Sequence, residues 1–132
     1  MEKEKSCGAI VYNQNNEVLV VKHNAGHWDF PKGHMEKDET EQQTAIREVK
    51  EETNIDVELY DNYRYEIHYS PKENVEKTVV FFLAKNLSND THKQDAEIAN
   101  IGWFKYEEAM TMLTFEDAKK LLKSSYEDLN NI

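Results

Sequence analysis

Three glutamates, Glu48, Glu51 and Glu52, occur within five residues of a helix-permissive segment. On a helical wheel of about 100° per residue they point off one edge of the apolar stripe, with Glu48 and Glu52 one turn apart. Like charges at this spacing cost a helix roughly a few tenths of a kcal/mol, and Arg47 is expected to pair only with Glu51. A hard divalent cation such as Mg²⁺ would reverse this repulsion and also bind substrate phosphates. The alternative is a solvated acidic surface helix.

The segment that carries these glutamates has the start and stop signals of a helix. Asp38 and Glu41 have the spacing of a capping box, and no Gly or Pro follows before Asn54. Asn54 stands where a left-handed C-terminal cap is expected. The residues predicted to face a sheet are Gln42, Ala45, Ile46, Val49 and Thr53.

The rest of the chain alternates short strand patterns with polar turns. Strands are predicted over residues 6–12, 17–22, 55–59, 63–69, 78–84 and 98–104, the first two forming a hairpin. Residues 28–38 have no regular period and predict a structured loop, while residues 87–96 predict a polar connection. Two further helices are predicted over residues 106–113 and 115–129. The narrow apolar stripe of the last helix favours inward packing and a monomer.

Composition excludes several classes of protein. The chain has 132 residues, enough for a single domain over residues 1–132 and little more. It has no apolar run long enough to span a bilayer and no signal-peptide pattern, so no membrane association and a cytoplasmic location are expected. The formal net charge of −10 disfavours nucleic-acid binding but not a metal-screened phosphate site. The single cysteine, Cys7, lies in an apolar run and predicts a buried thiol.

The residues from Gly33 to Ile55 resemble the signature of the Nudix hydrolases, G-x5-E-x7-R-E-U-x-E-E-x-G-U, where U is a bulky aliphatic residue. The one departure is Asn54 in place of the last glycine, and because Asn is the next-best residue for a left-handed cap, the helix end and the activity are expected to survive. The resemblance implies an α/β fold, with a mixed β-sheet sandwiched between α-helices. It also implies hydrolysis of a nucleoside diphosphate linked to another group.

The same resemblance implies roles for individual residues. Divalent metal, Mg²⁺ or alternatively Mn²⁺, would be bound by Glu48, Glu51 and Glu52 with Gly33 close by. Arg47 would orient a carboxylate through a salt bridge and so belongs to the catalytic set. Glu39 would support the arrangement of loop and helix.

Residues Trp28 to His34 resemble the W-x-x-P-K-G-H run of Nudix diadenosine tetraphosphate hydrolases and of diphosphoinositol polyphosphate phosphohydrolases. Lys32 supplies a positive charge, and the backbone around Gly33 is suited to holding a chain of phosphates. His34 belongs to this run and is assigned a phosphate contact. A structural or surface role is the alternative for His34.

Lys77, Tyr69 and Glu97 resemble residues of the tetraphosphate hydrolases outside the signature. Lys77 stands at the start of a predicted strand, from which its side chain would reach a substrate phosphate. Tyr69 resembles the tyrosine that stacks on adenine in these enzymes. Phe115 is a candidate for a second aromatic residue that stacks on a base. Glu97 precedes Trp103 by six residues, and the tetraphosphate hydrolases have a glutamate at the same distance before a tryptophan. The resemblance implies that Glu97 is an additional metal ligand or base. The alternatives are a solvated lysine, core aromatics and a solvated loop carboxylate.

We therefore expect metal-dependent hydrolysis of a small nucleotide substrate, with diadenosine tetraphosphate giving ATP and AMP. Diphosphoinositol polyphosphates and RNA 5′-triphosphate ends are rival substrates, although both favour a denser cationic surface than this chain offers. A catalytically silent nucleotide-sensing module on the same fold is the rival from another class.

Overall fold

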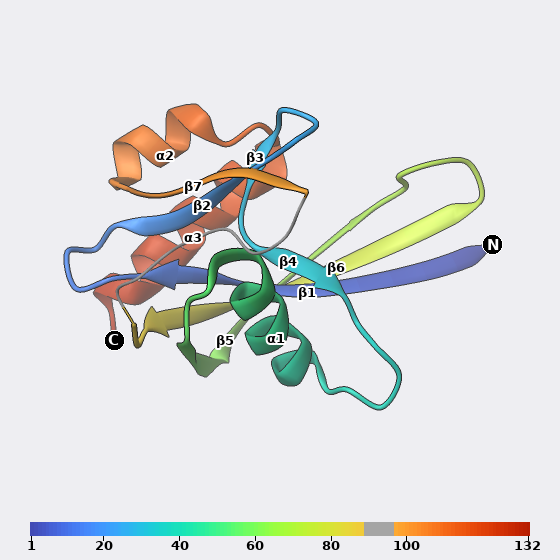
Figure 1. The fold of residues 1–132 in the computed structure, drawn as a ribbon, viewed down its shortest axis with the longest axis horizontal. Helices are drawn as coiled ribbons and strands as arrows, with labels where there is room; N and C mark the ends of the chain where they lie inside the picture. The colour runs from blue at the N-terminus through green and yellow to red at the C-terminus, as the bar shows by residue number, and fades with distance from the viewer. Residues whose placement is uncertain (89–96) are drawn as a thin grey trace.

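A computed structural model describes residues 1–88 and 97–132 (Figure 1). In this part of the chain, seven strands form one mixed sheet and three helices cover it. The strands are β1 (Glu2–Tyr12), β2 (Val18–His23), β3 (Trp28–Asp29), β4 (Lys32–His34), β5 (Val57–Tyr69), β6 (Val75–Asn86) and β7 (Ile98–Phe104). The helices are α1 (Glu41–Thr53), α2 (Tyr106–Met112) and α3 (Glu116–Asn130). No described helix has the length and apolar character needed to cross a bilayer.

Strand β1 is the centre of the sheet. It runs parallel to β6 over its whole length and antiparallel to β2 and β4. The main order is β3-β2-β1-β6-β5, with β4 added to β1 and β7 added to β2. Strands β1, β6 and β5 extend beyond the helices as an arm that ends near the N-terminus (Figure 1).

Both faces of β1 are buried from Ser6 to Tyr12, which explains why its residues from Cys7 to Val11 include no charged side chain. Successive residues point to opposite faces. Cys7, Ala9 and Val11 pack in clusters with residues of α1, and burial raises the pKa of the Cys7 thiol to about 11. Ile10 and Tyr12 pack in the cluster that includes α2 and α3. The predicted buried thiol is confirmed.

Two predictions about the strands need correction. Residues 28–38 are not wholly a loop, because β3 pairs with β2 and β4 pairs with β1. These strands of two and three residues are too short to produce a period in the sequence. The strands predicted at 55–59 and 63–69 form one strand, β5, whose register with β6 shifts between Tyr60 and Arg64. Part of the predicted connection over residues 87–96 lies outside the described residues.

The start of α1 also differs from the prediction. The N-cap is Thr40, whose side chain accepts from the backbone N–H of Gln43 while the Gln43 side chain accepts from the Thr40 N–H. Asp38 has a φ of 69° and lies two residues before the N-cap. Glu41 forms a bidentate ion pair with Arg64 instead of a capping bond. The predicted Asp38/Glu41 capping box is therefore wrong.

The buried face of α1 is rotated relative to the predicted one. Ala45, Val49 and Thr53 are buried as expected, but Gln42 is exposed and Ile46 is 42% exposed. Glu48 and Glu52 are buried in their place. A helical wheel that selects the buried face by hydrophobicity could not identify this face, because two of its buried residues are glutamates.

Asn54 ends α1 in the left-handed conformation, with a φ of 66°, and its N–H donates to the Lys50 carbonyl. The predicted left-handed cap is confirmed. We expect Asn54→Ala to lower the free energy of unfolding by about 1 kcal/mol, because a Cβ with no local polar compensation is strained there. Asn54→Gly is expected to match or exceed the wild type. Chemical denaturation of the three proteins tests this, and an equal loss for Ala and Gly would contradict it.

Candidate active site

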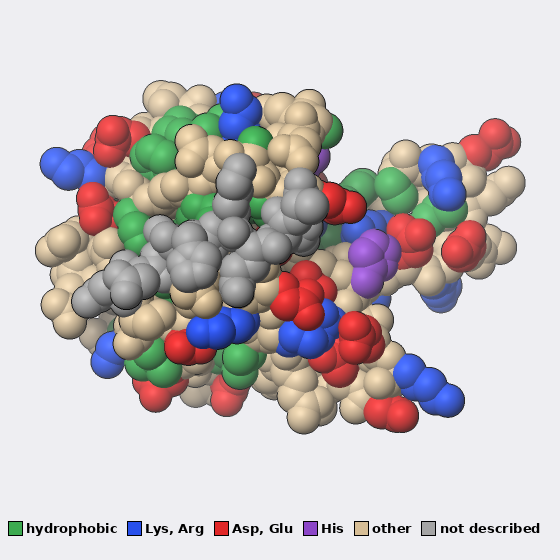
Figure 2. Space-filling view, viewed as in Figure 1, with side chains coloured by type: hydrophobic (Ala, Val, Ile, Leu, Met, Phe, Trp, Pro, Cys, Tyr) green, Lys and Arg blue, Asp and Glu red, His purple; other side chains and the backbone are tan. Residues whose placement is uncertain are grey.

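Arg47 of α1 joins four groups that come from three segments. Its Nε and Nη2 donate to the two oxygens of Glu39 at 2.7 and 2.9 Å. Its Nη1 donates to Glu48 at 2.7 Å and to Glu51 at 3.2 Å, and Nη2 also donates to the His34 carbonyl at 3.0 Å. The prediction that Arg47 pairs only with Glu51 is wrong, because a wheel shows neighbours on the helix but not the loop before it. Figure 2 shows acidic and basic side chains gathered where β4 meets α1.

Strand β4 lies directly against the buried glutamates of α1. A Cβ on Gly33 would overlap the Glu48 carboxylate, so the absence of a side chain at Gly33 leaves room for this close approach. The backbone N–H of Lys32 donates to Glu52 Oε1 at 3.3 Å. Side chains alternate along β4, so Lys32 and His34 point to the opposite face of the sheet from Gly33. The backbone of β4 thus separates the glutamates from a second compartment.

The donor types around β4 fit a hard divalent cation. Glu48 and Glu52 are buried carboxylates one turn apart, and cations of this kind take carboxylate and carbonyl oxygens. Within residues 1–88 and 97–132, however, no three His, Cys, Asp or Glu side chains converge as a formed metal site. Glu51 is largely exposed and is bound to Arg47. Ion binding at this cluster would therefore involve rearrangement of the Arg47 ion pairs.

A cavity of about 510 Å³ lies on the other side of β4. Two exposed aromatic side chains, Tyr69 from the end of β5 and Phe115 from the residue before α3, line it. The complete lining is His27, Asp29, Lys32, Ile67, Tyr69, Phe81, Phe115, Glu116, Asp117 and Ala118. Three predicted site residues, Lys32, Tyr69 and Phe115, therefore line the same cavity. The volume of this cavity suits a nucleoside.

Two lysines, Lys32 and Lys77, lie close to each other, and Lys32 lines the cavity. Lys32 Nζ lies 3.5 Å from Asp29 Oδ2. Burial, followed by the positive charge of Lys32, lowers the pKa of the Lys77 ammonium. Lys77 faces the same side of the sheet as Tyr69, its register partner on β5. An anion placed between the two lysines would relieve their repulsion.

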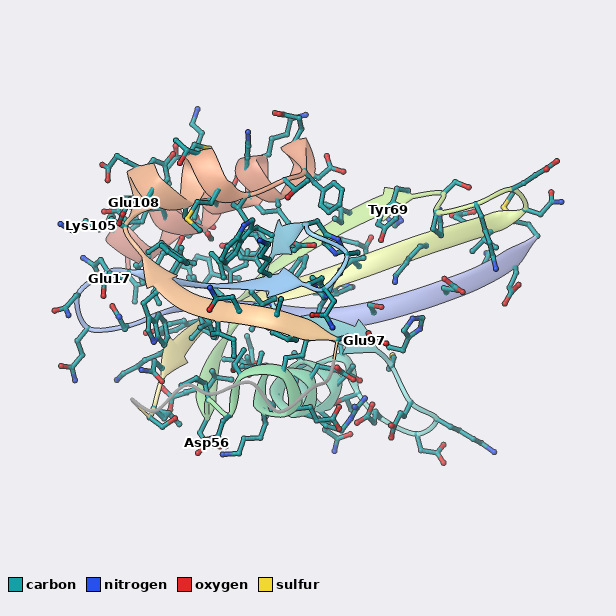
Figure 3. The ribbon with its side chains drawn as sticks, turned by 45° about the horizontal axis from the view of Figure 1, so that its top comes forward. Glu17, Asp56, Tyr69, Glu97, Lys105 and Glu108 are labelled. Atoms are coloured by element: carbon teal, nitrogen blue, oxygen red, sulfur yellow. The ribbon has the colours of Figure 1, made fainter. Side chains whose placement is uncertain are left out.

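Two predicted site residues are more peripheral. His34 is exposed, and its backbone carbonyl accepts a hydrogen bond from Arg47. Glu97 is exposed at the start of β7, where its carbonyl accepts from the Asn24 N–H at 2.8 Å (Figure 3). The sequence reasoning missed His27, Asp29, Glu116 and Asp117. Asp29 could have been found from its place within the Trp28 to His34 run.

Comparison with known proteins identifies the family. A family model described as NUDIX domain matches residues 2–125. The chain belongs to the Nudix family. It is a Nudix hydrolase acting on pyrophosphate bonds, and its mixed α/β fold is the Nudix fold. Enzymes of this family typically use a divalent metal ion.

Similar proteins share nearly the whole length of the chain. The asymmetrical bis(5′-nucleosyl)-tetraphosphatase of Sus scrofa is 31% identical over 140 aligned positions, which cover 95% of each chain. The enzyme of the same name from Caenorhabditis elegans is 31% identical over 127 positions, covering 90% of this chain and 91% of the relative. The crystal structure of a C. elegans Ap4A hydrolase binary complex superposes with a TM-score of 0.88 at 28% identity, covering 98% and 99% of the two chains.

The contact between β4 and α1 generates a stability prediction. Gly33→Ala is expected to lower the free energy of unfolding by about 1–3 kcal/mol, because the new methyl group displaces the Glu48 carboxylate. In the double variant with Glu48→Ala, the space is restored and the combined loss should be smaller than the sum by about 1 kcal/mol. Denaturant unfolding of the four proteins measures this coupling, and strictly additive losses would contradict the contact.

The Glu39 ion pair generates a pH prediction. The Arg47 hydrogen bond, aided by the Glu36 N–H, lowers the pKa of Glu39 from its usual 4.5 to about 2. The ionised form is therefore favoured on folding, and its contribution is complete above about pH 4.5 and lost as the pH falls toward about 2. Glu39→Gln should make the thermal midpoint less dependent on pH in this window. Glu41, held near the same pKa by Arg64, will leave a residual slope, and an unchanged slope in the variant would refute the assignment.

Proposed function

We propose that this Nudix hydrolase cleaves dinucleoside polyphosphates asymmetrically, converting diadenosine tetraphosphate and water to ATP and AMP. The observation that carries the proposal is the cavity lined by Tyr69, Phe115 and Lys32, which shares strand β4 with the buried glutamates. Such a cavity suits a base between aromatic rings, with its phosphates leading toward β4. Similarity to the named tetraphosphatases over most of their length supports the same substrate.

The residues around β4 would divide the chemistry. Glu48, Glu51 and Glu52, with backbone oxygen near Gly33, would hold Mg²⁺ or Mn²⁺. The bound ion supplies charge neutralisation at the phosphates and a more acidic water. Lys32 and Lys77 would bind non-bridging phosphate oxygens, and Arg47 would hold Glu48 and Glu51 in orientation.

The proposed reaction is an in-line attack of water at a terminal phosphorus of the tetraphosphate. The water oxygen bonds to the phosphorus attached to one adenosine, and the anhydride bond to the next phosphate breaks. One carboxylate of the set Glu48, Glu51, Glu52 and Glu97 would accept the water proton, while ATP leaves with the bridging oxygen and AMP remains. The exposed position of Glu97 leaves it able to approach an incoming substrate.

Other functions compete with this proposal on specific grounds. Diphosphoinositol polyphosphates and RNA 5′-triphosphate ends would require a denser cationic surface, whereas the cavity wall carries the carboxylates Asp29, Glu116 and Asp117. A catalytically silent nucleotide-sensing module would retain the aromatic cavity but release no product. The buried carboxylates Glu48 and Glu52 favour an enzyme.

Product analysis tests the proposed reaction. Purified protein with diadenosine tetraphosphate and Mg²⁺ should release ATP and AMP, separated by chromatography. Glu52→Gln should lower turnover by several orders of magnitude with the fold intact, because it removes a buried charge while keeping side-chain shape. The matched control is Glu107→Gln on the exposed surface of α2, which should retain wild-type turnover.

Each other outcome has a defined meaning. Two ADP molecules would retain the hydrolase and refute the site of attack. Absence of any product would favour inositol pyrophosphates or RNA 5′-triphosphate ends as the substrate, or a catalytically silent nucleotide-sensing module. Near-wild-type turnover of Glu52→Gln would refute the metal-site assignment.

A further inference from the structure

Asp29 is a buried carboxylate in a cavity that we assign to an anionic substrate. It is the last residue of β3, is 7% exposed, and lines the cavity together with Lys32. Taking a carboxylate out of water costs free energy unless partners compensate it, and here it also opposes binding of phosphate nearby. A hydrogen-bond donor on the ligand would give this side chain a role.

The two oxygens of Asp29 have different partners. Oδ1 accepts from the backbone N–H of Phe30 at 2.8 Å, which holds the carboxylate in place. Oδ2 lies 3.5 Å from Lys32 Nζ, longer than the roughly 2.7–2.9 Å of a strong charge-assisted bond. Because an ionised carboxylate offers about four acceptor positions, Oδ2 retains capacity for a donor.

The order of three lining residues in the chain matches the order of groups in a nucleotide. His27 contacts the Phe115 ring, with centroids 5.5 Å apart, at the aromatic end of the cavity. Asp29 follows two residues later and Lys32 three residues after that, all three lining the same cavity. A base at Phe115 and a phosphate at Lys32 would leave the ribose beside Asp29. Ribose hydroxyl groups are donors, whereas phosphorylated ring positions of an inositol are not.

Resting on the function proposed above, we infer that Asp29 is a specificity-determining residue that recognises the ribose. Its Oδ2 accepts a hydrogen bond from a ribose hydroxyl of the nucleoside bound between Tyr69 and Phe115. The same negative charge repels a phosphate group attached at that position. Asp29 thereby selects a nucleoside 5′-phosphate end over a ring that carries phosphates on every side.

Hydrolysis of matched substrates tests this role. For the wild type, kcat/KM should be about 10- to 100-fold higher for diadenosine tetraphosphate than for whichever analogue, 2′-deoxy or 3′-deoxy, lacks the recognised hydroxyl, as expected for a bond to a charged group. In Asp29→Ala this ratio should fall to near one. Asp29→Asn keeps an acceptor oxygen and the Phe30 bond, so its ratio should be intermediate. Asp56→Ala, which removes an exposed carboxylate paired with Lys50 and far from Tyr69 in the view of Figure 3, should keep the wild-type ratio.

The ratio within one variant separates recognition from a merely structural role. If Asp29 only positions Lys32, its loss would slow all substrates equally and leave the ratio unchanged, which overturns the inference. A wild type that treats the ribose and both deoxyribose substrates alike overturns it as well. Should Asp29→Ala fail to fold, the Asn variant decides by the same criterion.

Binding without turnover separates failure of this inference from failure of the proposed reaction. If no dinucleotide is hydrolysed, calorimetric titration with AMP and its 2′-deoxy and 3′-deoxy forms still measures ribose recognition. A preference of the wild type for AMP over one of its deoxy forms, reduced in Asp29→Asn, supports the role of Asp29. Absence of AMP binding, or equal affinity for all three nucleotides, overturns it.

Discussion

The ion pairs of Arg47 hold the candidate active site together. One guanidinium binds the loop through Glu39, strand β4 through the His34 carbonyl, and its own helix through Glu48 and Glu51. A planar group with five N–H donors can do this, whereas a lysine ammonium could not bind Glu39 in the same bidentate manner. Without this cation, the acidic groups of the loop and of α1 would repel one another. The position of α1 against β4 therefore depends on a charge balance as well as on apolar packing.

Strand β4 separates the buried glutamates of α1 from the aromatic cavity. Its three residues alternate, so the missing side chain of Gly33 admits the Glu48 carboxylate on one face while Lys32 reaches the cavity on the other. A side chain at position 33 would displace this carboxylate from its place against β4. A strand of this length gains little stability from its own hydrogen bonds and relies on β1, which is buried on both faces.

Much of the fold was predictable, because the spacing of apolar residues and the residue types at turns agree with the helices and strands that form. The helices, the left-handed cap at Asn54 and the strands later in the chain follow from local patterns. The start of α1 did not, since Thr40 and Asp38 are both good caps and only the backbone conformation decides between them. The buried carboxylates Glu48 and Glu52 lie against Gly33 and Lys32 of β4, which are distant in sequence. The aromatic cavity needed three dimensions, because Tyr69 and Phe115 come from different layers.

The parallel pairing of β1 and β6 sets the order in which the chain can assemble during synthesis. Glu2 pairs with Val75 and Tyr12 with Lys85, so the central ladder joins segments more than seventy residues apart. Such distant pairing makes loop closure the slow step of folding. On the ribosome, the apolar N-terminal strand has to wait until β6 has emerged. During that interval its neighbours are β2 and β4, whose antiparallel hydrogen bonds cover one edge of a segment otherwise open to aggregation.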